Sequence, residues 1–233
     1  MKNILVRERK AEDKKTTQKV ETEDPIKMSF DRDTSIPNGK VVLDFSLPEL
    51  KIGDKVLSRD IELNVVGPKK VAIVGKNGVG KTTLICEIKD ILEETEGIDL
   101  GYMSQDYADV LDNEDIVLDY LLEDLKDLEM SVISAYMGRI KLTWQEMNGK
   151  IEELSYGQKA KLMILKMMLA NKNVLLFDEP TRNLSSLSNP VIRDILKSYK
   201  GAIIGVSHDR KFLKEVCDIV YKLDENALKE IEI

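Results

Sequence analysis

The sequence predicts an α/β fold with a mainly parallel sheet and helices on both of its faces. A continuous apolar run at residues 71–74 is typical of a buried parallel strand, and a helical pattern follows it at residues 82–92. Beyond residue 153 strands and helices alternate, which is the order that builds a parallel sheet. Apolar and polar residues alternate over 41–47 and 61–65, which predicts a small antiparallel β-subdomain ahead of the first buried strand.

A glycine-rich turn, residues 75–82, joins that strand to its helix and fits G-x-x-x-x-G-K-[ST] in full. The glycines allow backbone N–H groups to curl round a phosphate without Cβ clashes, and the helix start adds its positive dipole end. We expect Lys81 to reach the β- and γ-phosphates and the Thr82 hydroxyl to ligate Mg²⁺. The expected nucleotide-binding residues of this loop are Gly75, Lys76, Asn77, Gly78, Gly80, Lys81, Thr82 and Thr83. The alternative, an ordinary glycine-rich turn, is disfavoured because the motif sits between a strand and a helix.

Composition excludes several classes of protein. The chain has 233 residues, 42% of them hydrophobic, and a net charge of -7. The negative net charge argues against sequence-independent binding of nucleic acid by the whole surface. Cys86 and Cys217 lack metal-site spacing, so we expect buried thiols in a reducing compartment. No apolar run is long enough to span a membrane, and no signal peptide is evident. We therefore expect a cytoplasmic protein without direct membrane insertion.

Two further regions differ from the α/β pattern. Residues 1–40 are rich in charged residues and indicate a linker tail, or equally a disordered N-terminus, ahead of a domain at 41–233. Residues 106–153 have apolar residues at helical spacing and predict a helical subdomain. Trp144 within it is expected to be a core residue.

Four more pieces follow the phosphate loop in a fixed order: Gln105, the run Leu154-Ser155-Tyr156-Gly157-Gln158, an apolar strand ending in Asp178-Glu179, and His208. This order resembles that of the ATP-binding cassette (ABC) ATPases, and the match covers nearly everything from about residue 41. The resemblance implies a P-loop NTPase fold of ABC type, with ATP and Mg²⁺ as its ligands.

Two runs in the second half of the chain resemble one subfamily of these ATPases. The runs Asp178-Glu179-Pro180-Thr181-Arg182-Asn183-Leu184-Ser185 and Ser207-His208-Asp209-Arg210 are similar to the second, C-terminal cassette of the ABC-F proteins. Members of that family have two cassettes in one chain, lack transmembrane domains and bind the ribosome, and some protect it from antibiotics. The Thr181-Arg182-Asn183 form is similar to the antibiotic-resistance branch. The resemblance implies that the charged tail is the end of the linker between cassettes, and that the chain is a fragment or a truncated gene product.

Roles for individual residues follow from the resemblance. Asp178 would hold Mg²⁺ together with Thr82 and Gln105, and Glu179 would be the general base that polarises the attacking water. We expect the strand pleat to turn Glu179 away from Asp178, toward the γ-phosphate. His208 would position the γ-phosphate and the water through Nε2, and Gln105 would couple the pocket to the helical subdomain. Without the resemblance, a lone histidine is usually structural, and an Asp-Glu pair after a strand also suits a helix start.

A helix is expected to begin at Ser155, Gly157 and Gln158, and the exposed N–H groups of its first turn can bind phosphate. In the family these residues meet ATP held by another cassette. The resemblance therefore implies a composite site, a second cassette in the same full-length chain or in a homodimer, and weak ATP hydrolysis by an isolated half.

The chain departs from the family pattern at two positions. Ile52 stands where an aromatic ring usually meets adenine, with Phe45 somewhat earlier, so only apolar contact with the base is expected. Ser185 replaces a usual aspartate. Two other functions stay open: the ATPase subunit of an ABC membrane transporter, and a nucleotide-gated binding module with negligible catalysis.

Overall fold

The computed structural model describes residues 34–109, 111, 114–125, 127–179 and 189–232. Most of the expected linker tail at 1–40 lies outside these ranges. The segment 180–188, which carries Thr181, Arg182, Asn183 and Ser185, lies outside them as well.

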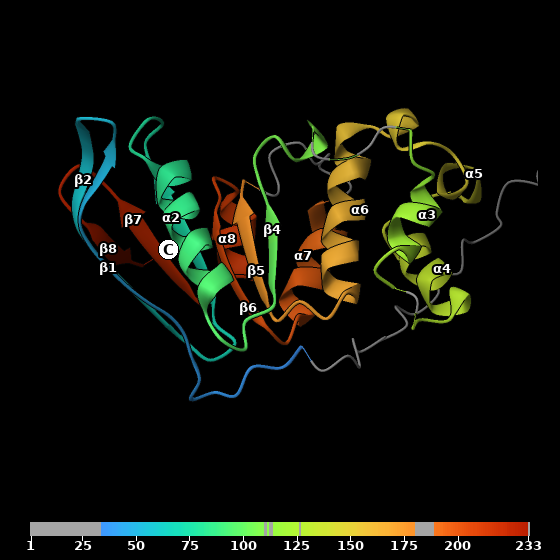
Figure 1. Cartoon of the computed structure of the whole chain (residues 1–233), viewed down its shortest axis with the longest axis horizontal. Coiled ribbons are helices and arrows are strands. Elements are labelled where there is room, and N and C mark those ends of the chain that lie inside the picture. Colours follow the sequence, from blue (N-terminus) through green and yellow to red (C-terminus); the bar gives the residue numbers. More distant parts are fainter. Residues whose placement is uncertain (1–33, 110, 112–113, 126, 180–188, 233) are drawn as a thin grey trace, which may run out of the picture. The chain divides into compact units, whose positions relative to one another are not determined.

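Within the described part of the chain, a six-stranded sheet runs in the order β4-β5-β6-β3-β7-β8 (Figure 1). The neighbouring strands are parallel except for β7 and β8, which form an antiparallel hairpin. The strands are β3 (Lys70–Gly75), β4 (Leu100–Met103), β5 (Val174–Asp178), β6 (Ala202–Val206), β7 (Ile219–Leu223) and β8 (Leu228–Ile231). The predicted, mainly parallel sheet is confirmed. Because β5 and β6 are buried along their whole length, they read in the sequence as continuous apolar runs.

The predicted antiparallel β-subdomain is also confirmed. Strands β1 (Val41–Ile52) and β2 (Lys55–Val66) pair antiparallel, with Leu47 opposite Ile61. Gly53 adopts a positive φ of 57° in the turn between them. The inner face of the hairpin packs into the same apolar core as the helix after the phosphate loop, which places the hairpin beside that loop.

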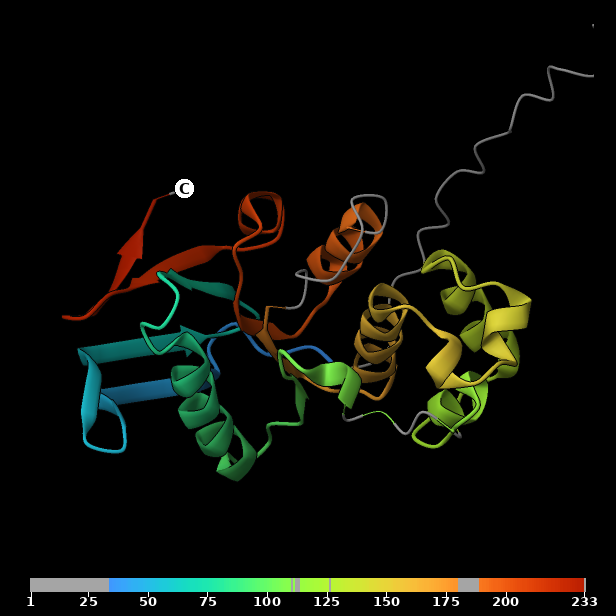
Figure 2. The same cartoon turned by 90° about the horizontal axis from the view of Figure 1, so that it is seen from above.

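Helices cover both faces of the sheet (Figure 2). On one face lies α2 (Lys81–Glu94), which buries Leu84, Ile85, Ile88 and Leu92. On the other lie α7 (Asn189–Ser198) and α8 (Arg210–Glu215). The remaining long helix is α6 (Tyr156–Leu169), and a short loop connects its C-terminal end to β5.

Short helices occupy much of residues 106–153, the range expected to be helical. They are η1 (Tyr107–Asp109), α3 (Val117–Leu122), α4 (Met130–Arg139), α5 (Trp144–Met147) and η2 (Ile151–Glu153). Apolar side chains from several of them are buried, among them Val117, Leu121, Ile133 and Met137. None of the described helices is both long and apolar enough to cross a bilayer.

Two burial predictions are wrong. Trp144 is 68% exposed, because it is the first residue of a single-turn helix that is fixed by a capping box between Thr143 and Glu146 and buries Met147 instead. Cys86 is exposed, since the buried stripe of α2 runs through Leu84, Ile85 and Ile88 and leaves Cys86 on the outer side. Cys217 is half-buried, and desolvation raises the pKa of its thiol to about 12.

Candidate nucleotide site

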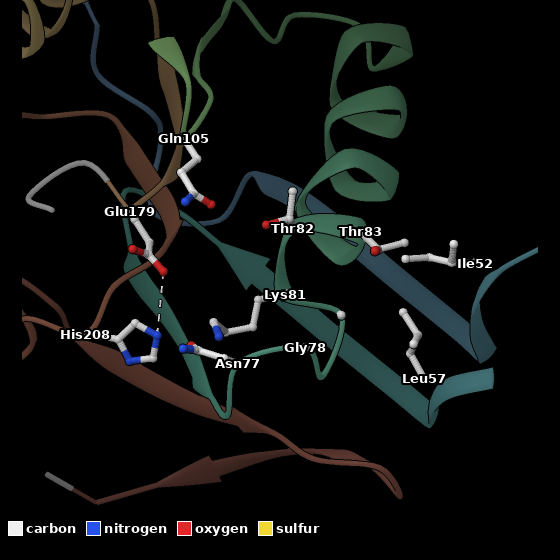
Figure 3. Close-up of a pocket in the computed structure, with 11 residues that line it drawn as sticks. Ile52, Leu57, Asn77, Gly78, Lys81, Thr82, Thr83, Gln105, Glu179 and His208 are labelled. Carbon is white, nitrogen blue, oxygen red and sulfur yellow. Dashed lines mark ion pairs between the residues drawn. The ribbon is translucent and has the colours of Figure 1, made fainter. Parts of the chain in front are cut away.

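A cavity of about 540 Å³ opens where the loop after β3 meets the carboxyl ends of β4, β5 and β6 and the β1–β2 hairpin (Figure 3). Carboxyl ends of parallel strands share one edge of the sheet, so residues far apart in sequence converge there. The cavity is lined by Ile52, Leu57, Asn77, Gly78, Gly80, Lys81, Thr82, Thr83, Gln105, Glu179 and His208.

The loop conformation requires glycine at defined positions. Gly78 and Gly80 have φ values of 80° and 103°, in the region that side chains disfavour. A Cβ on Gly80 would lie 2.9 Å from Leu57 Cδ1, and one on Gly75 would lie 2.7 Å from the Leu223 carbonyl oxygen. The glycines therefore keep the loop close to the hairpin and to β7 while its backbone curls.

Lys81 is held inside the curl of the loop. Its side chain is 8% exposed, and Nζ donates hydrogen bonds to the carbonyl oxygens of Gly75 and Lys76, each at 3.0 Å. Because α2 begins at Lys81, the free N–H groups of its first turn face the same space. An anion entering the loop would meet an ammonium group and a helix N-terminus together.

Asp178 ends β5 beneath this loop and has the chemistry of a cation ligand. Its side chain is 2% exposed, and burial raises the pKa of the carboxyl group against the opposing effect of a hydrogen bond with the Thr82 side chain. Its Oδ2 is buried and has no hydrogen-bond partner among the described residues. An unsatisfied buried carboxylate oxygen beside a threonine hydroxyl fits Mg²⁺, which prefers hard oxygen ligands.

Glu179 and His208 lie next to each other at one end of the cavity (Figure 3). Glu179 Oε1 lies 3.6 Å from His208 Nε2, an ion pair when the imidazole is protonated. Glu179 is 18% exposed at its side chain, whereas His208 is 48% exposed. His208 follows β6, just before the Asp209 side chain caps α8 by accepting from the N–H groups of Lys211 and Phe212.

The expected reason for the orientation of Glu179 is wrong. β5 ends at Asp178, and Glu179 adopts a φ of 57°, so the pleat of the strand does not apply to it. Its N–H still donates to the Val206 carbonyl oxygen at 3.0 Å, which fixes the backbone beside β6. A positive φ is uncommon for a residue with a Cβ and recurs at functional sites.

Gln105 lines the cavity from the loop after β4. Two residues later, Tyr107 is 2% exposed and reaches the start of α6. Neither Tyr107 nor Leu57, which lines the cavity from β2, was predicted as a site residue. An isolated tyrosine in a polar loop carries no sequence signal for such a contact, whereas the apolar alternation of β2 places Leu57 on its inner side.

Ser155, Gly157 and Gln158 do not line the cavity. Ser155 is the N-cap of α6, its Oγ accepts from the Gln158 N–H, and Gln158 Oε1 accepts from the Ser155 N–H in return. Gln158 Nε2 also donates to Glu146 Oε1 at 2.5 Å. This capping arrangement satisfies polar groups at the N-terminus of α6, which lies outside the cavity lined by the phosphate loop of the same chain.

The two residues considered for contact with adenine, Ile52 and Phe45, differ in solvent exposure. Ile52 is 60% exposed and lines the cavity, whereas Phe45 is 4% exposed and lies in the core. Phe45 therefore does not supply an aromatic surface to this cavity.

Known proteins resemble this chain in sequence. A family model described as ABC transporter matches residues 58–182. ABC transporter F family member 5 of Arabidopsis thaliana is 30% identical over 83% of the chain and 29% of its own length. The ATP-binding protein Uup-like of Haemophilus influenzae is 30% identical over 81% of the chain and 43% of its own length. The chain thus spans less than half the length of these curated relatives.

Two solved structures that resemble the chain are ATP-binding cassettes. The dimeric post-hydrolysis state of the cassette MJ0796, bound to ADP and Pi, superposes with a TM-score of 0.66 at 18% identity, covering 83% of this chain and 98% of that one. A second dimeric structure of MJ0796, described as a bacterial ABC transporter cassette, gives a TM-score of 0.67 at 19% identity. At this identity the likeness shows the fold.

Proposed function

The chain belongs to the ABC transporter family as an ATP-binding cassette, and we propose that it is one cassette of an ABC-F-type protein. This protein would couple ATP-dependent closure of its cassettes to action on the ribosome. Relatives named ABC transporter F family member and Uup support the ABC-F assignment. We further propose that it is the C-terminal cassette of a two-cassette protein, of the antibiotic-resistance branch, with residues 1–40 as the end of the inter-cassette linker.

One observation carries the proposal: a single cavity brings the phosphate loop together with Gln105, Glu179 and His208 from three other segments. The curled loop, Lys81 and the start of α2 would bind the phosphates of ATP. Mg²⁺ carried by the nucleotide would neutralise phosphate charge, with Thr82, Asp178 and Gln105 as its protein contacts. Asp178 fits because its buried Oδ2 has no partner among the described residues.

Within that arrangement Glu179 would polarise the attacking water as general base. His208 would donate a hydrogen bond from Nε2 to the γ-phosphate, and its 3.6 Å approach to Glu179 keeps both groups at one end of the cavity. Glu179, which adopts a positive φ, lines this cavity. The cassette would therefore convert ATP to ADP and phosphate.

The helix start at Ser155, Gly157 and Gln158 would complete the site of a second cassette. Its N–H groups lie outside this chain's own cavity, which is the arrangement that a composite site requires. The chain would pair with another cassette or with a second copy of itself, and hydrolysis by one unpaired chain would be weak.

Sedimentation with purified ribosomes tests the proposal. The chain carrying Glu179→Gln, loaded with Mg·ATP, is expected to pellet with ribosomes and to stay in the supernatant without nucleotide. The family description and the transporter cassette fold keep one alternative, the ATPase subunit of a membrane transporter. Association with membranes but not with ribosomes would favour that alternative and contradict the ribosomal role.

A further inference from the structure

A second cavity, of about 720 Å³, lies on the other side of the phosphate loop. Three segments line it: residues 55–57 and 59 at the start of β2, residues 76–79 of the loop, and residues 222–226 at the β7–β8 turn. It shares Leu57, Asn77 and Gly78 with the nucleotide cavity, so the loop forms a wall between the two.

Direct contacts hold these three walls together. In the parallel ladder of β3 and β7, Val74 pairs with Lys222 and Gly75 with Leu223, which places the β7–β8 turn beside the loop. The Ser58 hydroxyl donates to the Asp224 carbonyl oxygen at 2.6 Å, which ties β2 to the same turn. The cavity is therefore a defined feature of the fold.

Positive charge is concentrated in this cavity. Its lining includes Lys55, Arg59, Lys76 and Lys222 against Asp224 and Glu225, in a chain whose net charge is -7. Arg59 is already paired, with Nη2 at 3.3 Å from Glu49 Oε1. The side chains of the three lysines make no ion pair or hydrogen bond with any residue that the structure describes.

The acidic residues of the lining form no ion pair with these lysines in the described part of the chain, although the pKa of Asp224, lowered mainly by backbone hydrogen bonds from Asn226 and Ala227, is lowered further by the charges of Lys229 and Lys222. Asp224 Oδ1 accepts hydrogen bonds from the backbone N–H groups of Asn226 and Ala227, at 2.9 and 3.1 Å, so its carboxylate closes the turn. Glu225 is exposed at the tip of that turn. Asn77 and Asn226 add neutral amide donors to the same lining.

From this clustering we infer a second anion site, on the outer side of the phosphate loop, that binds phosphate groups through Lys55, Lys76 and Lys222. Ammonium groups without a protein partner, on walls fixed in place, are the chemistry that phosphate recognition uses. The volume suits a short polyphosphate or one or two phosphate groups of a nucleic-acid backbone. The inference does not depend on ATP hydrolysis or on the ribosomal role.

Two phosphate sources can be separated by titrating the full chain with inorganic tripolyphosphate and with a short fluorescein-labelled single-stranded RNA. Saturating Mg·AMPPNP keeps the inner side of the loop filled. The test variant is Lys55→Ala/Lys222→Ala, which leaves Lys76 of the loop intact. The control, Lys197→Ala/Lys214→Ala, removes the same charge from exposed positions on α7 and α8.

The test variant is expected to bind at least one probe about tenfold more weakly than the wild type. The slope of log binding constant against log salt concentration should also become shallower by about one to two, while the control matches the wild type. Loss confined to tripolyphosphate would identify free polyphosphate, and loss of RNA binding would identify a nucleic-acid backbone. Equal weakening by both double variants, or no binding of either probe to the analogue-filled chain, would overturn the inference. Thermal melting checks that both variants fold.

Discussion

The hydroxyl of Tyr107 donates a hydrogen bond to the backbone carbonyl of Tyr156 at 2.9 Å, and the two rings meet edge to face with centroids 6.4 Å apart. Tyr107 follows Gln105, which lines the nucleotide cavity, and Tyr156 is the first residue of α6. One buried side chain therefore links the cavity loop to the helix start that would serve a second cassette.

Replacing Tyr107 with phenylalanine removes this hydrogen bond and keeps the ring. Because Tyr107 does not line the cavity, ATP binding to the single chain should be unchanged. Loss of a hydrogen bond worth about 1 kcal/mol should slow hydrolysis by paired chains about fivefold through a loosened α6 start. Tyr221→Phe, in β7 and outside the cavity, is the control, and equal rates for both variants would show that the link has no role in pairing.

An aromatic ring at position 52 should strengthen base binding. Ile52 lines the cavity with 60% of its surface exposed, so Ile52→Tyr would offer a flat ring without displacing core residues. A gain of about 0.5–1.5 kcal/mol corresponds to roughly two- to tenfold tighter ATP binding, measured by calorimetry.

The gain at position 52 should vanish for tripolyphosphate, which has no base. Ile91→Tyr, on α2 and outside the cavity, controls for an added exposed ring. Tighter tripolyphosphate binding by Ile52→Tyr would mean that position 52 does not lie near the base.

Asp178 should reduce the stability of the nucleotide-free chain at neutral pH. Burial raises the pKa of its carboxyl group above that in the unfolded chain, so the folded state binds its proton more tightly. Its contribution to stability is therefore present at low pH and is lost as pH rises through the raised pKa.

Asp178→Asn should accordingly raise the free energy of unfolding by about 1 kcal/mol at neutral pH, because it removes a buried charge. The difference from wild type should shrink as pH falls through the raised pKa. Urea unfolding across pH measures it, with exposed Asp54→Asn as control. A variant less stable than wild type at neutral pH would contradict this reading of the site, even if it loses hydrolysis.

The sequence predicted the fold well because its signals are strong and local. The glycine loop, the fully buried β5 and β6, and the alternation of β1 and β2 each have one structural solution. The resemblance to the ATP-binding cassettes implied that Gln105, Glu179 and His208 share one site, and the structure places them in one cavity, at the edge where the strand ends of the parallel sheet meet.

The features that sequence could not give depend on tertiary detail. Trp144 is exposed because polar capping, and not apolar packing, fixes its short helix. The positive φ of Glu179 arises where β5 stops, one residue earlier than strand alternation assumes. The lysine-lined second cavity joins Lys55, Lys76 and Lys222 from three separate segments, and no local pattern connects them.

The most direct measurement of the central claim is ATP turnover by Glu179→Gln compared with wild type, at chain concentrations that favour pairing. The Gln side chain keeps the shape but cannot accept a proton, so hydrolysis should fall by roughly 10²–10⁴ while Mg·ATP still binds. Glu62→Gln, exposed on β2 and outside the cavity, should turn over at the wild-type rate. Turnover by Glu179→Gln at the wild-type rate would contradict the assignment of Glu179 as general base.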